Sequence, residues 1–322
     1  WGWYQYDHST KSYCMKLSIV IPTFNEVQNV PLLHDELTKT LKSLKHPYEI
    51  IFADDGSTDG TRDALRKLAQ DKNVKVLFHR RNFGQTAAMD SGFKYAHGDV
   101  IITMDADLQN DPADIPKLLA KLDEEYDVVS GWRKYRQDPF SKKLFSRIAG
   151  KMRKILTREK IHDSGCTLKA YRKECFTNLD LYGEMHRYIP AILTWRGFRI
   201  TEIVVNHRPR RFGTTKYGMG RILRGFLDLL IVKFWMQYST RPIQLFGRLG
   251  LSCFALGFLA GLFLLWQKFV DGQTIANRPL LLLVVLLILL GVQFFGMGVI
   301  TDALTKLYYR ASPISRVSET LE

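Results

Sequence analysis

Two long uncharged apolar segments near the C-terminal end limit most strongly how this chain can fold. Leu249 to Trp266 is 18 residues long and Pro279 to Thr301 is 23, and neither contains a charged side chain. As helices at ~1.5 Å per residue they would measure ~27 and ~35 Å, close to the ~30 Å hydrocarbon core of a bilayer. Three glycines dilute the first segment, namely Gly250, Gly257 and Gly261. Because small residues also let membrane helices pack closely, we expect two transmembrane helices at about 247–268 and 279–301.

The distribution of basic residues around these segments indicates their orientation. Several Lys and Arg side chains flank the pair on its outer sides: Arg221, Arg224, Lys233, Arg241, Arg248, Lys306, Arg310 and Arg316. The connecting loop carries only Lys268 and Arg278. Since cytoplasmic flanks are enriched in Lys and Arg, we expect a multi-pass integral membrane protein with its N-terminal domain and its tail, 302–322, in the cytoplasm. Residues 1–14 lack the basic and apolar regions of a signal peptide and are left as an unassigned N-terminal extension.

The formal net charge of +14 is concentrated in one part of the chain. Between Arg133 and Arg224, basic residues outnumber acidic ones by 23 to 7. A basic surface beside membrane spans attracts anionic lipid headgroups and phosphorylated substrates. The sequence lacks zinc-finger spacing, an RNA-binding aromatic signature and a basic zipper helix, so we expect a lipid bilayer and no nucleic acid as a partner.

Strand-like and helix-like patterns alternate before the apolar segments. Strands are predicted at 17–22, 48–53, 75–78, 100–104, 127–130 and 167–171, with helices at 25–44, 58–71, 86–96 and 114–125. Such alternation is typical of a mostly parallel α/β sheet with helices on both faces.

Polar residues follow four of these strands, at Thr23–Glu26, Asp54–Asp59, His79–Gly84 and Asp105–Gln109. Each segment alone can be read as a turn or a helix cap. In open parallel sheets, however, the carboxyl ends of the strands lie at one edge, where ligands bind. Four polar segments at that edge favour a binding site over four unrelated turns.

Asp105-Ala106-Asp107-Leu108-Gln109 is the most informative of the four. A lone Asp-x-Asp is more often a polar turn, but two carboxylates and an amide also offer the hard oxygen ligands that Mg²⁺ or Mn²⁺ prefers. The chain has no glycine-rich phosphate loop of the G-x-G-x-x-G or Walker type. Neutralisation of phosphates is therefore expected to come from a metal and from arginines.

Together, the motifs Pro22–Glu26, Asp54–Asp59, Arg81–Gly84 and Asp105–Gln109 resemble family 2 glycosyltransferases of the GT-A fold. Two further motifs narrow the resemblance to the polyprenyl-phosphate glycosyltransferases, the group that includes dolichyl-phosphate mannose synthase: Gly131-x-Arg133-x-x-Arg136 and His207-x-x-Arg210-x-x-Gly213-x-Thr215-Lys216-Tyr217. The resemblance covers roughly 16–217, and the two apolar segments are similar to those of the bactoprenol glucosyltransferase branch. It implies a cytoplasmic GT-A domain at 15–217 and an amphipathic juxtamembrane segment at 218–246.

The resemblance also implies roles for individual residues. The nucleotide sugar would be bound by Pro22, Asn25, Glu26, Asp54, Asp55, Arg81, Asp105 and Ala106, and Asp105 would also be a catalytic residue. Asp107 and Gln109 would hold Mg²⁺ or Mn²⁺. Phosphates of donor and acceptor would be bound by Arg133, Arg136, Arg210 and Lys216. The Gln-x-x-Arg-Trp motif of processive synthases is absent from the sequence, so transfer of a single sugar is expected.

The implied reaction is transfer of one sugar from a nucleotide sugar to undecaprenyl or dolichyl phosphate. A monophosphate with a second pKa near ~6 is already largely ionised at neutral pH, so no strong base is needed and inversion is expected. UDP-glucose is the expected donor, with UDP-galactose and GDP-mannose left open. Asp163 has two readings. It is either a catalytic carboxylate that faces the sugar and the acceptor and orients the phosphate or accepts a proton, or a cap or turn residue before the next strand.

Two other functions fit the same sequence less well. An acceptor with a hydroxyl group, such as diacylglycerol, would need a base to deprotonate it. A non-catalytic membrane scaffold would have no use for Asp105, Asp107 and Gln109. A flippase and a second glycosyltransferase would act downstream of a lipid-linked sugar, and the small residues of the spans would permit a homo-oligomer.

Overall fold

The computed structural model describes residues 15–134, 161–181, 183–212, 231–234, 237–238, 241–274 and 279–311. The chain divides into two compact units, Trp1–Val232 and Lys233–Glu322, which are described separately. The predictions at Arg136 and Lys216, and most of the expected amphipathic segment 218–246, lie outside the described residues.

A seven-stranded sheet forms the centre of the first unit, in the order β3-β2-β1-β4-β6-β5-β7. The strands are β1 Leu17–Thr23, β2 Tyr48–Asp54, β3 Val74–Phe78, β4 Val100–Thr103, β5 Val128–Trp132, β6 Lys169–Arg172 and β7 Ile200–Val204. Only β6 runs antiparallel to its neighbours β4 and β5, and the other pairs are parallel. The mostly parallel sheet expected from the sequence is therefore confirmed.

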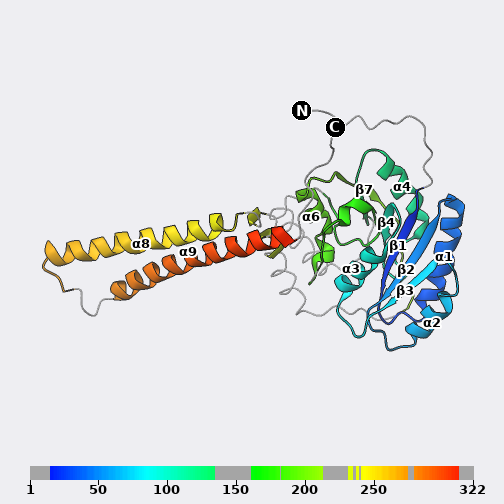
Figure 1. Ribbon diagram of the computed structural model, residues 1–322, viewed down its shortest axis with the longest axis horizontal. Coiled ribbons are helices and arrows are strands. Elements are labelled where there is room, and N and C mark those ends of the chain that lie inside the picture. Colours follow the sequence, from blue (N-terminus) through cyan, green and yellow to red (C-terminus); the bar gives the residue numbers. More distant parts are fainter. Residues whose placement is uncertain are drawn as a thin grey trace. The chain divides into compact units, whose positions relative to one another are not determined.

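Helices cover both faces of this sheet (Figure 1). They are α1 Asn29–Leu44, α2 Thr61–Leu68, α3 Gln85–Tyr95, α4 Ile115–Asp123 and α6 Ile189–Trp195, with short 3₁₀ turns at Pro112–Asp114, Lys173–Phe176 and Met185–Arg187. Apolar residues of α1, α2 and α4 join one buried cluster, and those of α3 and α6 join the other. The sequence pattern predicted the first four helices but not α6 or the edge strand β7.

The apolar patterns explain why the central elements form. All seven residues of β1 are buried, as expected for a parallel strand covered on both faces. In α1, the buried apolar side chains recur at the helical spacing of three and four residues, at Val30, Leu33, Leu37 and Leu41. Burial of these side chains fixes α1 against one face of the sheet and so positions the loop between β1 and α1.

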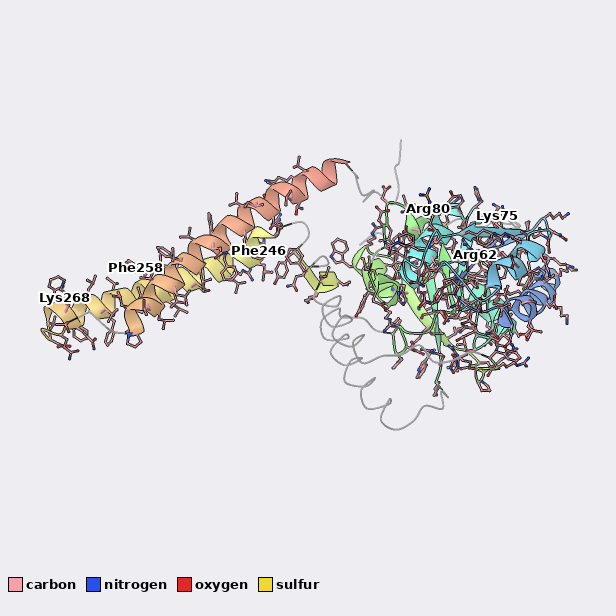
Figure 2. All side chains as sticks on the ribbon, turned by 90° about the horizontal axis from the view of Figure 1, so that it is seen from below. Arg62, Lys75, Arg80, Phe246, Phe258 and Lys268 are labelled. Atoms are coloured by element: carbon pink, nitrogen blue, oxygen red, sulfur yellow. The ribbon has the colours of Figure 1, made fainter. Side chains whose placement is uncertain are left out.

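The second unit is a helical hairpin of α8 Ile243–Phe269 and α9 Pro279–Ala311. Both helices are long and apolar enough to cross a membrane, and only 17% and 11% of their most apolar windows are buried within the structure. Such low burial does not fit the core helix of a soluble protein. Phe246, Phe258 and Lys268 follow one another along α8 (Figure 2).

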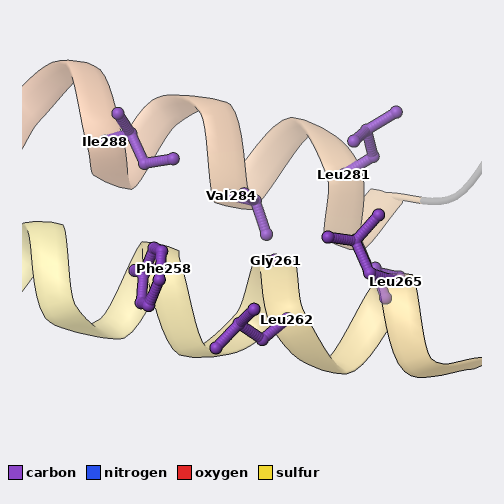
Figure 3. Close-up of a pocket in the computed structure, with 9 residues that line it drawn as sticks. Phe258, Gly261, Leu262, Leu265, Leu281, Val284 and Ile288 are labelled. Carbon is purple, nitrogen blue, oxygen red and sulfur yellow. The ribbon is translucent and has the colours of Figure 1, made fainter.

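Glycines set the distance between the two helices. A Cβ atom at Gly250 would lie 2.7 Å from the carbonyl oxygen of Gly291, and one at Gly257 would lie 3.0 Å from Ile288. Farther along, Val284 packs over Gly261, beside a shallow apolar groove (Figure 3). The small residues of α8 thus serve the contact with α9.

Candidate active site

The loops after β1 and β2 are locked together at the carboxyl edge of the sheet. The Asn25 backbone N–H donates to Ser57 Oγ at 2.8 Å, and the Thr58 N–H donates to Asn25 Oδ1 at 2.9 Å. Asn25 is in the left-handed region with φ 56°, so α1 begins at Asn29 rather than at the predicted Asn25. The next residue, Glu26, receives the same kind of support, because its N–H donates to Thr61 Oγ1 at 2.8 Å. Two predicted donor-binding residues are therefore held by hydroxyl side chains and one backbone N–H of the segment between the end of β2 and the start of α2.

Asp55 fixes the loop that follows β3. One of its carboxylate oxygens accepts from the Phe83 N–H and the other from the Gly84 N–H, both at 2.8 Å. His79 Nδ1 lies 3.0 Å from the same carboxylate. Asp55 is 3% exposed, so its carboxylate is shielded from solvent and is hydrogen-bonded within the protein.

Gly56 allows the same loop to approach closely. It has φ +75°, and a Cβ atom there would lie 2.5 Å from the Arg81 carbonyl carbon and 2.7 Å from the Asn82 nitrogen. Only glycine tolerates both conditions. The guanidinium of Arg81 lies over the Phe83 ring, 4.5 Å from its centroid.

Asp54, the last residue of β2, is completely buried. Its carboxylate accepts from the Ser57 N–H at 3.2 Å and lies 3.2 Å from Arg62 Nε. Pro22 on β1 and Ala106 after β4 are also buried, so their side chains contribute shape rather than polar contacts.

Asp105 is held from two sides. Gln85 Nε2 donates to Oδ1 at 2.9 Å, and Thr167 Oγ1 donates to Oδ2 at 2.6 Å. Its own N–H donates to Asn110 Oδ1 at 3.0 Å. Burial, together with the negative charge of Asp107, raises the pKa of Asp105 to about 6. The carboxylates of Asp105 and Asp107 therefore lie close enough to repel each other when both are ionised.

Asp107 lies beside Asp105 and forms an ion pair. Its Oδ2 lies 2.7 Å from Arg210 Nη2, and its Oδ1 accepts from the Gln109 N–H at 3.1 Å. Leu108, which lies between Asp107 and Gln109 in the sequence, is buried and has φ 60°. This left-handed conformation costs a non-glycine residue free energy and is often found at functional sites. The structure thus brings the predicted metal ligands and a predicted phosphate-binding arginine together.

The segment that carries Arg210 is anchored by Arg208. The Arg208 N–H donates to the Gln109 carbonyl at 2.9 Å, and its guanidinium lies 2.6 Å from both Asp111 and Glu36. This anchoring explains how residues a hundred positions apart in the sequence come into contact.

Arg133 and Asp163 pair with each other. Arg133 Nε and Nη2 donate to the two carboxylate oxygens of Asp163 at 2.7 and 2.9 Å, a two-point geometry. Burial alone would raise the pKa of Asp163, but the hydrogen bonds and charge of Arg133 outweigh it and hold the pKa below its usual value. Asp163 is therefore an ionised carboxylate and a weak base.

The donor set fits a divalent cation that is shared with a substrate. The described residues contain no group of three or more His, Cys, Asp or Glu side chains that could hold a metal ion by themselves. Asp107 and Gln109 offer hard oxygen ligands, and the carboxylate of Asp105 lies close enough to Asp107 for the two charges to interact. Mg²⁺ commonly binds one or two carboxylates together with substrate phosphates.

Several residues of the site were not predicted from the sequence. Gln85 and Thr167 hold Asp105, Thr86 Oγ1 lies 2.7 Å from Nδ1 of the buried His186, and Lys169 is buried under the segment before β6. None of them belongs to a motif with a mechanistic meaning. Their one sequence signal is position, since Gln85 and Thr86 directly follow the Arg81–Gly84 motif.

Comparisons with known proteins agree with this geometry. Residues 18–179 match the family described as "Glycosyl transferase family 2". Dodecaprenyl-phosphate galacturonate synthase of Rhizobium johnstonii is 43% identical over 307 residues, covering 93% of this chain and 91% of the relative. Undecaprenyl-phosphate 4-deoxy-4-formamido-L-arabinose transferase of Yersinia pestis is 36% identical over 303 residues, covering 92% and 91%.

A solved structure shows the same fold. Glucosyl-3-phosphoglycerate synthase from Mycobacterium tuberculosis, in complex with Mn²⁺ and UDP-glucose, is similar with a TM-score of 0.52 and 19% identity, covering 68% of this chain and 79% of that one. The same enzyme in complex with Mg²⁺ and UDP gives a TM-score of 0.52 at 17% identity.

Proposed function

Because the chain belongs to glycosyl transferase family 2, we propose that it transfers a single sugar from a nucleotide sugar to a polyprenyl phosphate. The two curated relatives are named as synthases or transferases that act on dodecaprenyl or undecaprenyl phosphate, and each aligns over more than nine tenths of this chain. The observation that carries the proposal is the meeting of Asp105, Asp107 and Arg210 at the carboxyl edge of the sheet.

The chemistry needs charge stabilisation more than a strong base. A bond forms between an acceptor phosphate oxygen and the anomeric carbon, while the bond from that carbon to the nucleoside diphosphate breaks. Since the acceptor oxygen is already ionised, Asp163 with its lowered pKa does not have to remove a proton. Attack from the face opposite the leaving group inverts the anomeric centre.

Different residues of the site bind the donor, bind the acceptor and stabilise the leaving group. Asn25, Glu26, Asp54, Asp55 and Arg81 form the donor side, where the interlocked loops after β1, β2 and β3 are fixed. Arg133, aligned by Asp163, binds the acceptor phosphate. Arg210 lies on Asp107 and supplies positive charge for the leaving diphosphate. Asp107 and Gln109 would hold Mg²⁺ or Mn²⁺, which adds positive charge at the same place.

The second unit supports a membrane location for the enzyme. α8 and α9 cross the bilayer as a two-span hairpin, and the Lys and Arg residues on its outer flanks keep the catalytic domain and the tail in the cytoplasm. A polyprenyl phosphate presents its charged group at this membrane surface.

The sugar is the least constrained part of the proposal. UDP-glucose is the donor expected from the sequence, whereas the relative from Rhizobium johnstonii is named as a galacturonate synthase. UDP-galacturonate therefore belongs beside UDP-glucose, UDP-galactose and GDP-mannose among the donors to be tested.

The experiment is incorporation of labelled sugar into undecaprenyl phosphate by the full chain, with Mn²⁺ or Mg²⁺, for each donor. We expect lipid-linked label from one donor, dependent on the metal and at least about 100-fold lower in Asp107→Ala. Label in diacylglycerol instead would identify another lipid acceptor. No labelled lipid from any donor would contradict the proposal and favour a scaffold.

A further inference from the structure

Lys169 is a buried cation that the reaction outlined above does not use. It lies on β6, is 3% exposed, and stands opposite Thr103 of β4 and Ser130 of β5. It therefore lies between the strand that leads to Asp105 and the strand that leads to Arg133. A lysine in such a position costs free energy compared with an apolar side chain of similar length, so its presence needs a reason.

The ammonium of Lys169 is used to hold a short segment of backbone. Its Nζ donates to the carbonyl oxygen of Ser164 at 3.0 Å and to that of Cys166. Both carbonyls belong to residues 163–167, which we call the bridging segment. Lys169 thus binds the backbone in the middle of the bridging segment through two carbonyl oxygens.

The two ends of the bridging segment contact the two halves of the site. At one end, Asp163 pairs with Arg133, which is expected to bind the acceptor phosphate. At the other end, Thr167 donates its hydroxyl to Asp105 on the donor side. Thr103 Oγ1 adds a bond to the Thr167 carbonyl at 2.6 Å. The bridging segment therefore links the donor side of the site to the acceptor side by side-chain hydrogen bonds.

Two observations support a role in the site rather than in the fold alone. The hydroxyls of Ser130 and Ser164 are buried near Lys169, and neither has a hydrogen-bond partner in the described part of the chain. Lys169 also lies directly opposite Thr103, whose hydroxyl donates to the carbonyl of Thr167 in the bridging segment. Polar groups are concentrated here beyond what packing requires.

We propose that Lys169 is a positioning residue for sugar transfer: it holds the bridging segment so that Arg133 and Asp105 keep the spacing that brings acceptor phosphate and donor sugar into line. This rests on the proposed function. Misplacing one reactant by about 1 Å can cost about 100-fold in rate without weakening the binding of either partner. The expected signature is therefore a loss of transfer with retained nucleotide binding.

The test uses the full chain in lipid nanodiscs and compares wild type, Lys169→Met, Lys169→Arg and the control Lys75→Met. Lys75 pairs with Glu49 at 2.7 Å where the strands begin, away from the carboxyl edge, and is labelled in Figure 2. For each protein we would measure the thermal midpoint, UDP binding with Mn²⁺, sugar transfer to undecaprenyl phosphate and hydrolysis of the donor to free sugar.

We expect Lys169→Met to reduce transfer by about 100-fold, to raise the ratio of hydrolysis to transfer, and to leave UDP binding and the thermal midpoint near wild type. Lys169→Arg, which keeps the charge and donors, should recover part of the transfer. Lys75→Met loses the pair with Glu49 and should lower the thermal midpoint, but it should match wild type in transfer and in the ratio of hydrolysis to transfer. A merely structural lysine would instead lower the thermal midpoint and leave the ratio of hydrolysis to transfer unchanged, which would overturn the proposal.

A second variant keeps the test decisive if Lys169→Met does not fold. Thr167→Val removes the hydroxyl that links the bridging segment to Asp105 and leaves Lys169 in place. The same rise in hydrolysis relative to transfer is expected, and an unchanged ratio would refute the role of the segment. Absence of lipid product from wild type would refute the proposed function itself, whereas normal transfer by both variants would refute only the positioning.

Discussion

At the scale of single residues, the pairing of Asp163 with Arg133 indicates what Asp163 does in the site. The sequence left two roles open for Asp163, a carboxylate that orients the phosphate or accepts a proton, and a turn residue. In the structure both of its oxygens accept from one guanidinium, and its pKa is lowered. An ionised, fully engaged carboxylate is suited to orienting Arg133 rather than to exchanging protons.

Replacement of Asp163 by Asn tests this role. The substitution removes the charge and one acceptor, so Arg133 loses its fixed orientation while the fold keeps a side chain of the same size. We expect the KM for polyprenyl phosphate to rise by about tenfold or more and the KM for the donor to stay unchanged, as measured by initial rates.

Asp35→Asn is the matched control, because its side chain is 71% exposed on α1. It should behave as wild type. A change in the KM for the donor alone in Asp163→Asn would contradict the assignment of this pair to the acceptor.

The same scale shows what the sequence could reveal of the site. Asp105, Asp107 and Gln109 were predicted because their motif has a chemical meaning, and Arg133 was predicted from the family resemblance. Lys169 was not, because a lone lysine in a strand carries no signal until its neighbours β4 and β5 are known. Contacts across strands that are far apart in the sequence are invisible to local patterns.

At the scale of secondary-structure elements, Glu49 ties the beginnings of several strands together. Its carboxylate accepts from Ser18 Oγ of β1 at 2.6 Å and from the His97 N–H at 2.7 Å, and Lys75 Nζ of β3 lies 2.7 Å away. Burial alone would raise the pKa of Glu49, but these bonds lower it to about 2.

This lowered pKa predicts an acid-sensitive sheet. Because the pKa is about 2 in the folded protein and 4.5 in the reference state, the stabilisation by Glu49 is complete above pH 4.5 and is lost as the pH falls towards 2. At pH 7, Glu49→Gln should lower the free energy of unfolding by about 2 kcal/mol, and this difference should shrink below pH 4.5.

Thermal or denaturant unfolding of the full chain at pH 7 and pH 3 measures this difference. Glu124→Gln, on an exposed pair with Lys121, serves as the control and should have little effect at either pH. An equal effect of Glu49→Gln at both pH values would show that its charge does not stabilise the sheet.

The hairpin offers a second prediction at this scale. A Cβ atom at Gly291 would lie 2.9 Å from both the Gly250 carbonyl oxygen and the Phe254 nitrogen, whereas one at Gly296 of the same helix would have nothing within 4 Å. Gly291→Ala should therefore force α8 and α9 apart and destabilise the hairpin by about 1–3 kcal/mol, while Gly296→Ala should be neutral or stabilising.

Thermal unfolding of the two variants in the same detergent compares them directly. Equal thermal midpoints would mean that the helices are not held by the glycine contact.

The elements themselves were largely predictable. Alternating strand and helix patterns located β1 to β6 and four helices, because the strands are short apolar runs and the helices carry an apolar stripe. α6 and β7 were missed, and in β7 no residue is buried and the charged Glu202 lies at the centre of the strand. The antiparallel direction of β6 depends on its pairing with β4 and β5, which no local pattern encodes.

At the scale of the whole molecule, the chain joins a catalytic unit to an apolar hairpin. The expected resemblance to polyprenyl-phosphate glycosyltransferases is confirmed by relatives that align along nearly the full chain. A soluble family 2 domain has no need of two such helices, whereas an enzyme whose acceptor is anchored in the bilayer does. A catalytic unit joined to a membrane hairpin therefore fits an acceptor phosphate that is carried by a lipid better than a soluble acceptor.

Mass spectrometry of the lipid product made by the wild-type chain from undecaprenyl phosphate and the preferred donor tests this account most directly. We predict a single new species whose mass equals the acceptor plus one sugar residue, with one phosphate and with the nucleoside diphosphate released into solution. A product with two phosphates would indicate transfer of a sugar phosphate, and one with several sugars would indicate processive synthesis. Either of these products, or no product, would contradict the account.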